Sequence, residues 1–203
     1  MGEPVYVIVM IAVAVSAITG VLEAGRKPID LFGVVLVALT SALGGGTIRD
    51  LLLARPVFWV ADQTYLAAAI AAGVATFVLV RLVRLPANLF LLPDALGLAL
   101  FTVIGTQAAL SYGAPWFVAT FLGLVTGVLG GVLRDILCNE VPLVFAGELY
   151  ATASWAGAAV FIALLHAGIP DTVASLLAIA AIFLLRVAAI RWHLTLPSFA
   201  AKA

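Results

Sequence analysis

Long runs of apolar residues, separated by short clusters of charges and prolines, dominate the chain. Uncharged runs cover residues 4–22, 31–48, 63–80, 95–133, 149–170 and 172–185. The fourth run is too long for one membrane crossing, and the stretch SYGAP at residues 111–115 divides it in two. Each resulting run is near the roughly 20 residues that an α-helix needs to cross about 30 Å of hydrocarbon. The pattern predicts an all-α integral membrane protein with seven transmembrane helices.

The last of these runs is short, and it extends to residue 190 if the side chain of Arg186 snorkels to the membrane surface. We treat residues 1–203 as a single membrane domain, in which residues 171–192 form the seventh helix. The opening MGEPVYVIVM has neither a basic region nor an obvious small-residue cleavage site. We therefore interpret the first apolar run as a retained span rather than a signal peptide.

Composition supports a bilayer as the solvent of this chain. Of its 203 residues 65% are hydrophobic and only 10% are charged, and the mean hydropathy is +1.26. A soluble domain of this length needs more charge to cover its surface. The 10 basic and 10 acidic residues give zero net charge, which argues against a nucleic-acid partner.

Basic residues in short loops predict how the chain is oriented. Seven helices place three of the loops and the C-terminus on one side, which carries Arg26, Lys27, Arg81, Arg84, Arg191 and Lys202, with Arg186 close by. The opposite side has Arg55 and, near the end of the second helix, Arg49. We expect the N-terminus outside and the C-terminus in the cytoplasm.

A short motif occurs twice in the chain. GGTIRDLL at residues 45–52 matches GGVLRDIL at residues 130–137, an offset of 85 residues. The same offset carries Gly20 onto Gly105, Ser41 onto Thr126 and Tyr65 onto Tyr150, and Pro56 corresponds to Pro142 with a slip of one residue. Chance similarity between glycine-rich spans is the alternative, but it does not explain so many residue types in register.

The repeat predicts an inverted arrangement. Residues 4–85 and 93–168 each contain three predicted helices, and the second copy of an odd-numbered unit enters the membrane from the opposite side. Inverted repeats of this kind place a shared site near the bilayer midplane, where broken helices meet. We therefore predict a 3+3 inverted repeat followed by a seventh helix.

Glycines interrupt the second helix of each unit. Gly44, Gly45 and Gly46 lie within one, and Gly130 and Gly131 within the other. Each glycine costs about 1 kcal/mol relative to alanine in a helix, so we predict breaks whose freed carbonyls face a water-filled path. We expect the hydroxyls of Ser41, Thr47 and Thr126 to line that path. The alternative is that the glycines only allow helices to pack closely.

Each motif also places an ionisable pair inside an apolar segment. Arg49 and Asp50 form one pair, and Arg134 and Asp135 form the other. Charges at such positions are costly and usually face a cavity or a partner. Because consecutive residues of a helix point in different directions, we expect neither arginine to pair with its own neighbour. The four residues either line and gate a water path or tie helix ends to adjacent loops.

Other polar residues suggest less. Glu23 and Asp94 are predicted to be interfacial, and Asp62, Tyr65, Glu148 and Tyr150 to stand at helix starts, where negative charge is favoured. His166 and His193 are isolated, so we predict no metal site. The chain shows no nucleophile–base pair, zinc signature or phosphate loop. We predict no enzymatic activity and no cofactor.

The segments GGGTIRDLLLARPVFWV and GGVLRDILCNEVPLVFAGELYATASWAGA resemble the bacterial members of the trimeric intracellular cation channel family, also described as glycine-transporter-like. The resemblance covers roughly residues 5–190. It implies a homotrimer in a bacterial inner membrane, in contact with lipids, with one pore per subunit for potassium and sodium. It also implies kinks in the second and fifth helices at the glycines, although Leu129 stands where the first motif has Gly44.

Three functions remain open from the residues themselves. They are a passive cation channel, a secondary transporter for a small solute such as glycine, and a structural membrane protein. Broken helices offer carbonyls to a cation at one end and positive N-termini to a carboxylate at the other. The family resemblance favours the channel.

Overall fold

The computed structural model describes residues 3–83, 86 and 89–197, so that Arg84 and Lys202 of the orientation argument lie outside it. Within this part the regular elements are helices, and one isolated β-bridge joins Glu148 and Thr195. The helices are α1 (Glu3–Ala24), α2 (Leu31–Leu52), α3 (Phe58–Ala61), α4 (Thr64–Leu82), α5 (Leu91–Ser111), α6 (Trp116–Leu137), the 3₁₀ turn η1 (Leu143–Phe145), α7 (Ala151–His166) and α8 (Asp171–Trp192).

Six of the helices in the described residues are long and apolar enough to cross a membrane, namely α1, α2, α4, α5, α6 and α8. The shorter α7 is also apolar but has 16 residues. It begins at Ala151, two residues into its apolar run, and ends at His166, before the turn at residues 167–168. The prediction of an all-helical membrane protein is confirmed.

Local sequence explains where several of these helices begin and end. The carboxylate of Asp30 caps α2 by accepting a hydrogen bond of 2.8 Å from the Gly33 amide. Pro115 and Pro170 immediately precede α6 and α8, at helix starts, where a residue without an amide hydrogen is tolerated. Gly113, with a φ of +82°, makes the turn within SYGAP that separates α5 from α6.

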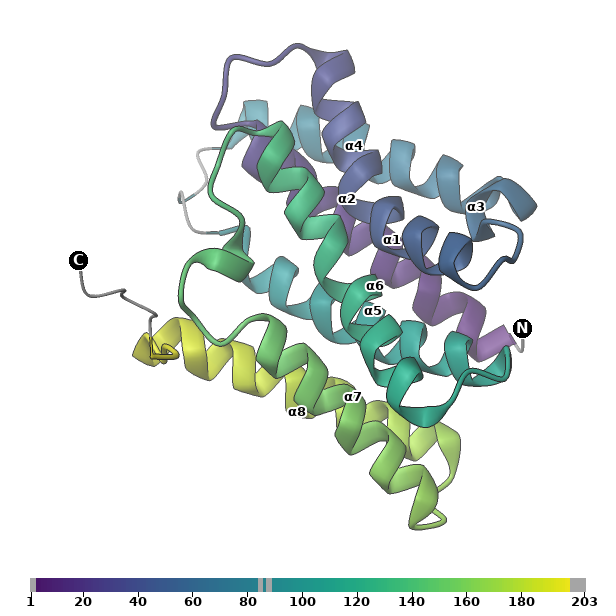
Figure 1. The fold of residues 1–203 in the computed structure, drawn as a ribbon. Coiled ribbons are helices and arrows are strands. Elements are labelled where there is room, and N and C mark those ends of the chain that lie inside the picture. Colours follow the sequence, from purple (N-terminus) through teal and green to yellow (C-terminus); the bar gives the residue numbers. More distant parts are fainter. Residues whose placement is uncertain (1–2, 84–85, 87–88, 198–203) are drawn as a thin grey trace, which may run out of the picture.

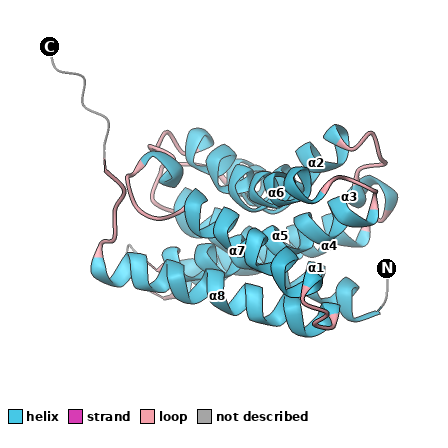
Figure 2. Cartoon of the chain, turned by 60° about the horizontal axis from the view of Figure 1, so that its bottom comes forward, coloured by secondary structure: helices cyan, strands magenta, loops and turns pink. Residues whose placement is uncertain are grey.

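The helices form a bundle in which α2 and α6 cross face to face (Figure 1). Helices α7 and α8 lie side by side at one edge, and α3 and α4 lie at the opposite edge. Helix α5 packs against α6 and also contacts α1 and α8, which makes it the most buried of the six candidate spans. Figure 2, turned by 60°, again shows α2 and α6 together on one face of the bundle.

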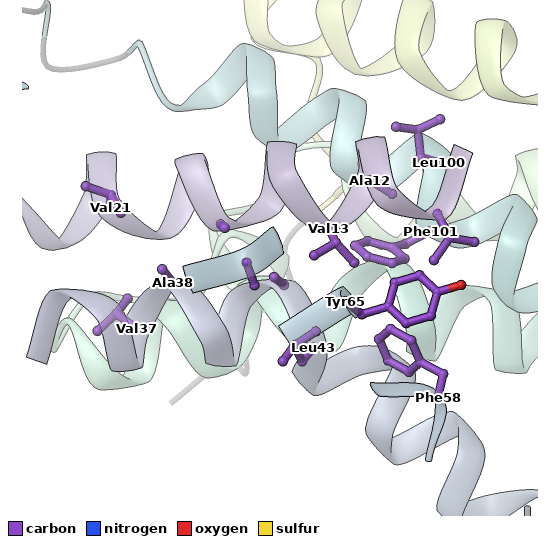
Figure 3. Packing of buried hydrophobic residues seen from close by; sticks show 14 of the residues in the cluster. Ala12, Val13, Val21, Val37, Ala38, Leu43, Phe58, Tyr65, Leu100 and Phe101 are labelled. Atoms are coloured by element: carbon purple, nitrogen blue, oxygen red, sulfur yellow. The ribbon is translucent and has the colours of Figure 1, made fainter. Parts of the chain in front are cut away.

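The apolar core consists of two clusters. One joins α1, α2, α4 and part of α5, and it includes the rings of Phe58, Tyr65 and Phe101, which converge beside Val13 (Figure 3). The other joins α5, α6, α7 and α8 around Phe161. Phe58 and Tyr65 meet edge to face with ring centroids 5.1 Å apart. Phe58 from α3 and Tyr65 from α4 thereby form an aromatic pair near the end of α2.

Candidate functional site

Helices α2 and α6 touch at two glycines. A Cβ atom on Gly45 would lie 2.1 Å from the carbonyl oxygen of Thr126, and a Cβ atom on Gly130 would lie 2.3 Å from that of Ser41. The two contacts are related by the offset of 85 residues that separates the motifs. Only a residue without a side chain allows the backbones to approach so closely. The crossing is therefore built on backbone contact.

The predicted helix breaks are wrong. Helices α2 and α6 are continuous through Gly44, Gly45, Gly46, Gly130 and Gly131. The physical reason is that the facing backbones fill the space that a side chain would take, so the close crossing offsets the low helix propensity of glycine. The packing role, considered above as the alternative, accounts for the glycines in this conformation.

The hydroxyl groups near the crossing bond mainly to their own helices. Thr126 donates to the Leu122 carbonyl at 2.6 Å, and Thr47 donates to the Leu43 carbonyl at 2.7 Å. Thr47 also accepts a hydrogen bond of 2.9 Å from the indole of Trp59. Ser41 and Thr126 are buried. In this conformation neither side chain faces a path that is open to the surface.

At the end of α2, one aspartate faces two arginines. Arg49 Nε donates to Asp50 Oδ1 at 2.8 Å, and Arg55 Nε lies 3.5 Å from the same oxygen. The other oxygen accepts a hydrogen bond of 2.9 Å from the Phe58 amide. The Arg49 guanidinium lies over the Phe58 ring, 5.7 Å from its centroid. We refer to Arg49, Asp50, Arg55 and Phe58 as the first-motif network.

At the end of α6, one arginine faces two aspartates. Arg134 Nε donates to Asp135 Oδ1 at 2.8 Å, and Arg134 Nη1 donates to Asp94 Oδ1 at 2.5 Å. Asp135 Oδ2 accepts a hydrogen bond of 3.0 Å from the Leu143 amide. Phe90 lies beneath the Arg134 guanidinium, 5.5 Å away. Asp94 comes from α5, so this site joins two helices.

A third buried arginine completes this second site from α8. Arg186 Nη1 donates to the Leu149 carbonyl at 2.7 Å and lies 3.5 Å from Glu148. Its guanidinium stacks on the ring of Tyr150, 4.8 Å from the centroid, and the Tyr150 hydroxyl lies close to Gly131. We refer to Asp94, Arg134, Asp135, Tyr150 and Arg186 as the second-motif network.

The expectation that each arginine avoids its neighbouring aspartate is wrong. Both motifs lie in the last turn of a helix. The aspartate there also accepts a hydrogen bond from an amide beyond the helix end, eight residues ahead, Phe58 in one case and Leu143 in the other. This bond turns the carboxylate sideways, where the long arginine side chain reaches it. Ala54 and Asn139, again 85 residues apart, take the left-handed conformation that folds the chain back, with φ of 49° and 53°.

Sequence reasoning missed three residues of the second-motif network. Asp94, predicted to be interfacial, is 6% exposed, and Arg186, predicted to snorkel, is fully buried. Tyr150, interpreted as a helix start without further role, is 2% exposed. A signal existed for Tyr150, which repeats Tyr65 in register. Arg186 lies five residues before Arg191, the last charged residue of its span, and is therefore well inside the apolar segment. A charge at that depth usually has a buried partner.

Clefts approach the two networks from opposite ends of the bundle. A cleft of about 410 Å³ is lined by Tyr6, Arg55, Phe58, Asp62, Tyr65, Tyr112 and their neighbours. Another, of about 550 Å³, is lined by Arg26, Arg81 and Phe90 among others. Each cleft includes the aromatic ring that stacks on a motif arginine, Phe58 on Arg49 and Phe90 on Arg134. An aromatic side chain therefore separates each cleft from a buried charge.

Within the part of the chain described by the structure, no group of three or more histidine, cysteine or acidic residues is arranged to hold a metal ion. The chemistry of the site is that of guanidinium, carboxylate, hydroxyl and aromatic groups.

Comparison with known proteins gives consistent results. The family model described as "Glycine transporter" matches residues 6–81 and 91–166, two segments offset by 85 residues. The chain is 43% identical to the UPF0126 inner membrane protein YadS of Escherichia coli over 97% of this chain and 96% of that protein.

Solved structures are also similar. The trimeric intracellular cation channel orthologue from Rhodobacter sphaeroides is 39% identical, with a TM-score of 0.89 over 94% of this chain and 98% of that one. A second structure, from a study of conductance through these cation channels, is 33% identical with a TM-score of 0.87 over both whole chains.

Proposed function

The chain belongs to the bacterial trimeric intracellular cation channel family, and on that premise we propose that it is a passive channel for monovalent cations, potassium and sodium. The similarity to the Rhodobacter sphaeroides channel over nearly the whole chain is the observation that carries this proposal. It makes the protein a conductor of ions rather than an enzyme.

In this proposal each subunit contains its own path, which runs along α2 and α6. The two clefts at opposite ends of the bundle and the polar networks behind them support this course. The path is closed at the glycine crossing and opens when α2 and α6 separate or rotate there. Ser41, Thr47 and Thr126 then face the ions, and Gly44, Gly45, Gly46, Gly130 and Gly131 provide the adjustable contact.

The arginines and aspartates of the motifs gate this path. Arg49, Asp50, Arg134 and Asp135 are buried where a resting channel requires a barrier. A positive side chain raises the energy of a cation nearby. A shift of either guanidinium therefore changes conduction, and a transmembrane potential acts on that charge by about 2.3 kcal/mol per 100 mV across the full membrane.

We infer that residues 4–85 and 93–168 form the inverted repeat and that α8 is an addition. The reciprocal glycine contacts and the two segments matched by the family model support this. The motifs also lie at opposite ends of α1. Arg49 borders a small void with Val9 near the start of α1, whereas Glu140, just after the second motif, pairs with Lys27 beyond the end of α1.

The assembly and location follow from relatives. The Rhodobacter sphaeroides protein is described as a trimeric channel and the Escherichia coli relative as an inner membrane protein. We propose a homotrimer in the bacterial inner membrane, surrounded by lipid. Arg26, Lys27 and Arg81 line neighbouring clefts beside the end of α1, and Arg191 lies in the last turn of α8. This grouping supports a cytoplasmic C-terminus and an external N-terminus.

A secondary transporter for a small solute such as glycine is the second candidate, favoured by the description of the matching family model. Recording from the purified protein in a planar bilayer under a potassium gradient distinguishes the two. Unitary current steps that reverse near the potassium equilibrium potential support the channel. Silent bilayers, together with saturable uptake of labelled glycine by proteoliposomes, would establish the transporter instead.

The course of the path is tested by accessibility. In a Cys138→Ala background, Ser41→Cys and Thr126→Cys are exposed to a water-soluble thiol reagent under conditions that open the channel. We expect both to react, while Ala178→Cys, buried on α8 away from the proposed path, does not. The native thiol must be removed even though burial raises its pKa to about 11. Unreactive cysteines at both positions would place the path elsewhere.

A further inference from the structure

The charged centres of the two motif networks, where the Arg-Asp pair meets its extra partner, carry opposite excess charge. The first contains two arginines and one aspartate, a formal excess of one positive charge. At the centre of the second, Arg134 faces Asp94 and Asp135, a formal excess of one negative charge. Arg186 is balanced separately by Glu148, 3.5 Å away. A cation is therefore attracted to the second network and repelled by the first.

The excess comes from Asp94. Its counterpart in the first repeat, 85 residues earlier, is the apolar Val9. Asp135 is fixed by the Leu143 amide and belongs to the same helix end as Arg134. Asp94 instead comes from α5 and touches Arg134 through one oxygen. Arg134 can therefore leave Asp94 and remain paired with Asp135.

Buried polar atoms without a hydrogen-bond partner also cluster in the second-motif network. Among the described residues, Asp94 Oδ2, Arg134 Nη2, and Arg186 Nε and Nη2 are buried without a hydrogen-bond partner. Arg134 Nη2 lies 2.8 Å from Asp135 Oδ1 but does not point along a hydrogen bond to it. Such atoms are costly in an apolar interior, and water entering an open path would satisfy them. Atoms of the first-motif network are absent from this group.

We propose that Asp94 is the carboxylate that selects cations in the path, and that Arg134 covers it in the closed conformation. When Arg134 moves away from α5, it keeps Asp135 as its counter-charge and uncovers both oxygens of Asp94. The uncovered carboxylate then binds a partly dehydrated potassium or sodium ion and repels chloride. This assignment rests on the channel function proposed above and names the residue that determines its charge selectivity.

The test measures reversal potentials of Asp94→Asn in planar bilayers under a KCl gradient. We expect the permeability ratio of potassium to chloride to fall by about tenfold, because the substitution removes one full charge from the narrow part of the path. Open probability rises, because the closed state loses its charged contact with Arg134. Asp94→Glu should retain the wild-type ratio. Asp171→Asn is the matched control, since Asp171 also lies in the first turn of a spanning helix but is exposed.

A purely structural role predicts something different. In that case Asp94→Asn lowers thermal stability, but the channels that survive keep the wild-type permeability ratio, and the proposal fails. If the single variant does not fold, Asp94→Asn combined with Arg134→Gln and Asp135→Asn removes all three charges and leaves the same zero formal excess as the single variant. A low ratio in the triple variant supports the assignment, and a wild-type ratio overturns it. A wild-type protein without unitary currents would instead refute the channel function itself.

Discussion

The two motif networks have the same backbone framework and different side-chain partners. In each, the aspartate of the Arg-Asp pair binds its neighbouring arginine and the amide eight residues ahead. In each, an aromatic ring lies beneath the arginine. The first network then adds Arg55 to its aspartate, whereas the second adds Asp94 to its arginine.

The comparison distinguishes the contacts that both repeats share from those that occur in only one of them. The conserved part closes a helix and turns the chain, and both halves need it for folding. The added part sets the local charge, and the position of Arg55 is occupied in the second half by Glu140, which has the opposite sign. We infer that the ends of the path have different tasks, with cation attraction concentrated at the second motif.

The largest expected effect tests the part that the halves share. Gly45→Ala and Gly130→Ala should each destabilise the protein by about 3 kcal/mol or more, because the new Cβ atoms would lie 2.1 and 2.3 Å from backbone carbonyl oxygens. Thermal unfolding in detergent and size-exclusion chromatography measure this.

Gly44→Ala is the matched control for the crossing. Its Cβ would meet the end of the Leu133 side chain at 2.8 Å, which can move aside. Alanine also gains about 1 kcal/mol of helix propensity, so we expect little net change. Equal losses in all three variants would mean that the glycines act through backbone flexibility and not through the close crossing.

The next prediction tests the contacts in which the two networks differ, namely the extra partner of each Arg-Asp pair. Asp50→Asn leaves two buried or partly buried arginines without their carboxylate, which should cost about 3–5 kcal/mol. Asp135→Asn should cost less, about 1–3 kcal/mol, because Arg134 keeps Asp94. The midpoints of thermal unfolding for the two variants give the order. The reverse order, or equal losses, would show that Asp94 does not compensate Arg134.

The sequence predicted the framework well because hydrophobic run length and turn residues act locally. Six of the seven predicted spans are long enough to cross a membrane, and the seventh is the shorter apolar helix α7. These helices, the separation of α5 from α6 at SYGAP and the doubled motif all follow from neighbouring residues. The partners of the charges depend on tertiary packing. Whether Asp94 or Arg186 faces the interior is determined by the rotation of α5 and α8 within the bundle, and hydropathy that is nearly uniform around those helices does not reveal it.

The continuity of the helices at the glycines also depends on tertiary packing and could not be predicted from local sequence. Intrinsic propensity correctly identifies Gly44, Gly45 and Gly46 as weak points of a helix, but it treats the helix as isolated. The facing backbone of α6 stabilises the continuous form, and that contact is made by residues about 80 positions away. Continuity of α2 could therefore be known only once the crossing was known.

The smallest effect concerns Glu140, the partly exposed residue that stands in the second half where the first half has Arg55. Glu140 lies 2.7 Å from Lys27, and both side chains are partly exposed. The hydrogen bond from Lys27 lowers the pKa of Glu140 below its ordinary value of 4.5. The folded protein thus holds the ionised carboxylate more strongly than the unfolded chain does. The resulting stabilisation is fully present above about pH 4.5 and is lost as the pH falls through the lowered pKa in the folded state.

Lys27→Gln isolates this contribution. We expect a small decrease in the melting temperature at pH 6–7, because partly exposed ion pairs contribute little, and no difference from the wild type once the pH is well below 4.5. Melting curves of both proteins in detergent between about pH 3 and pH 7 measure it, with added salt reducing the difference at neutral pH. A difference that persists unchanged at low pH would mean that Lys27 acts through packing. The loop after the second motif would then be held to α1 by apolar contacts, and the sign of the charge at position 140 would have no bearing on how the two halves differ.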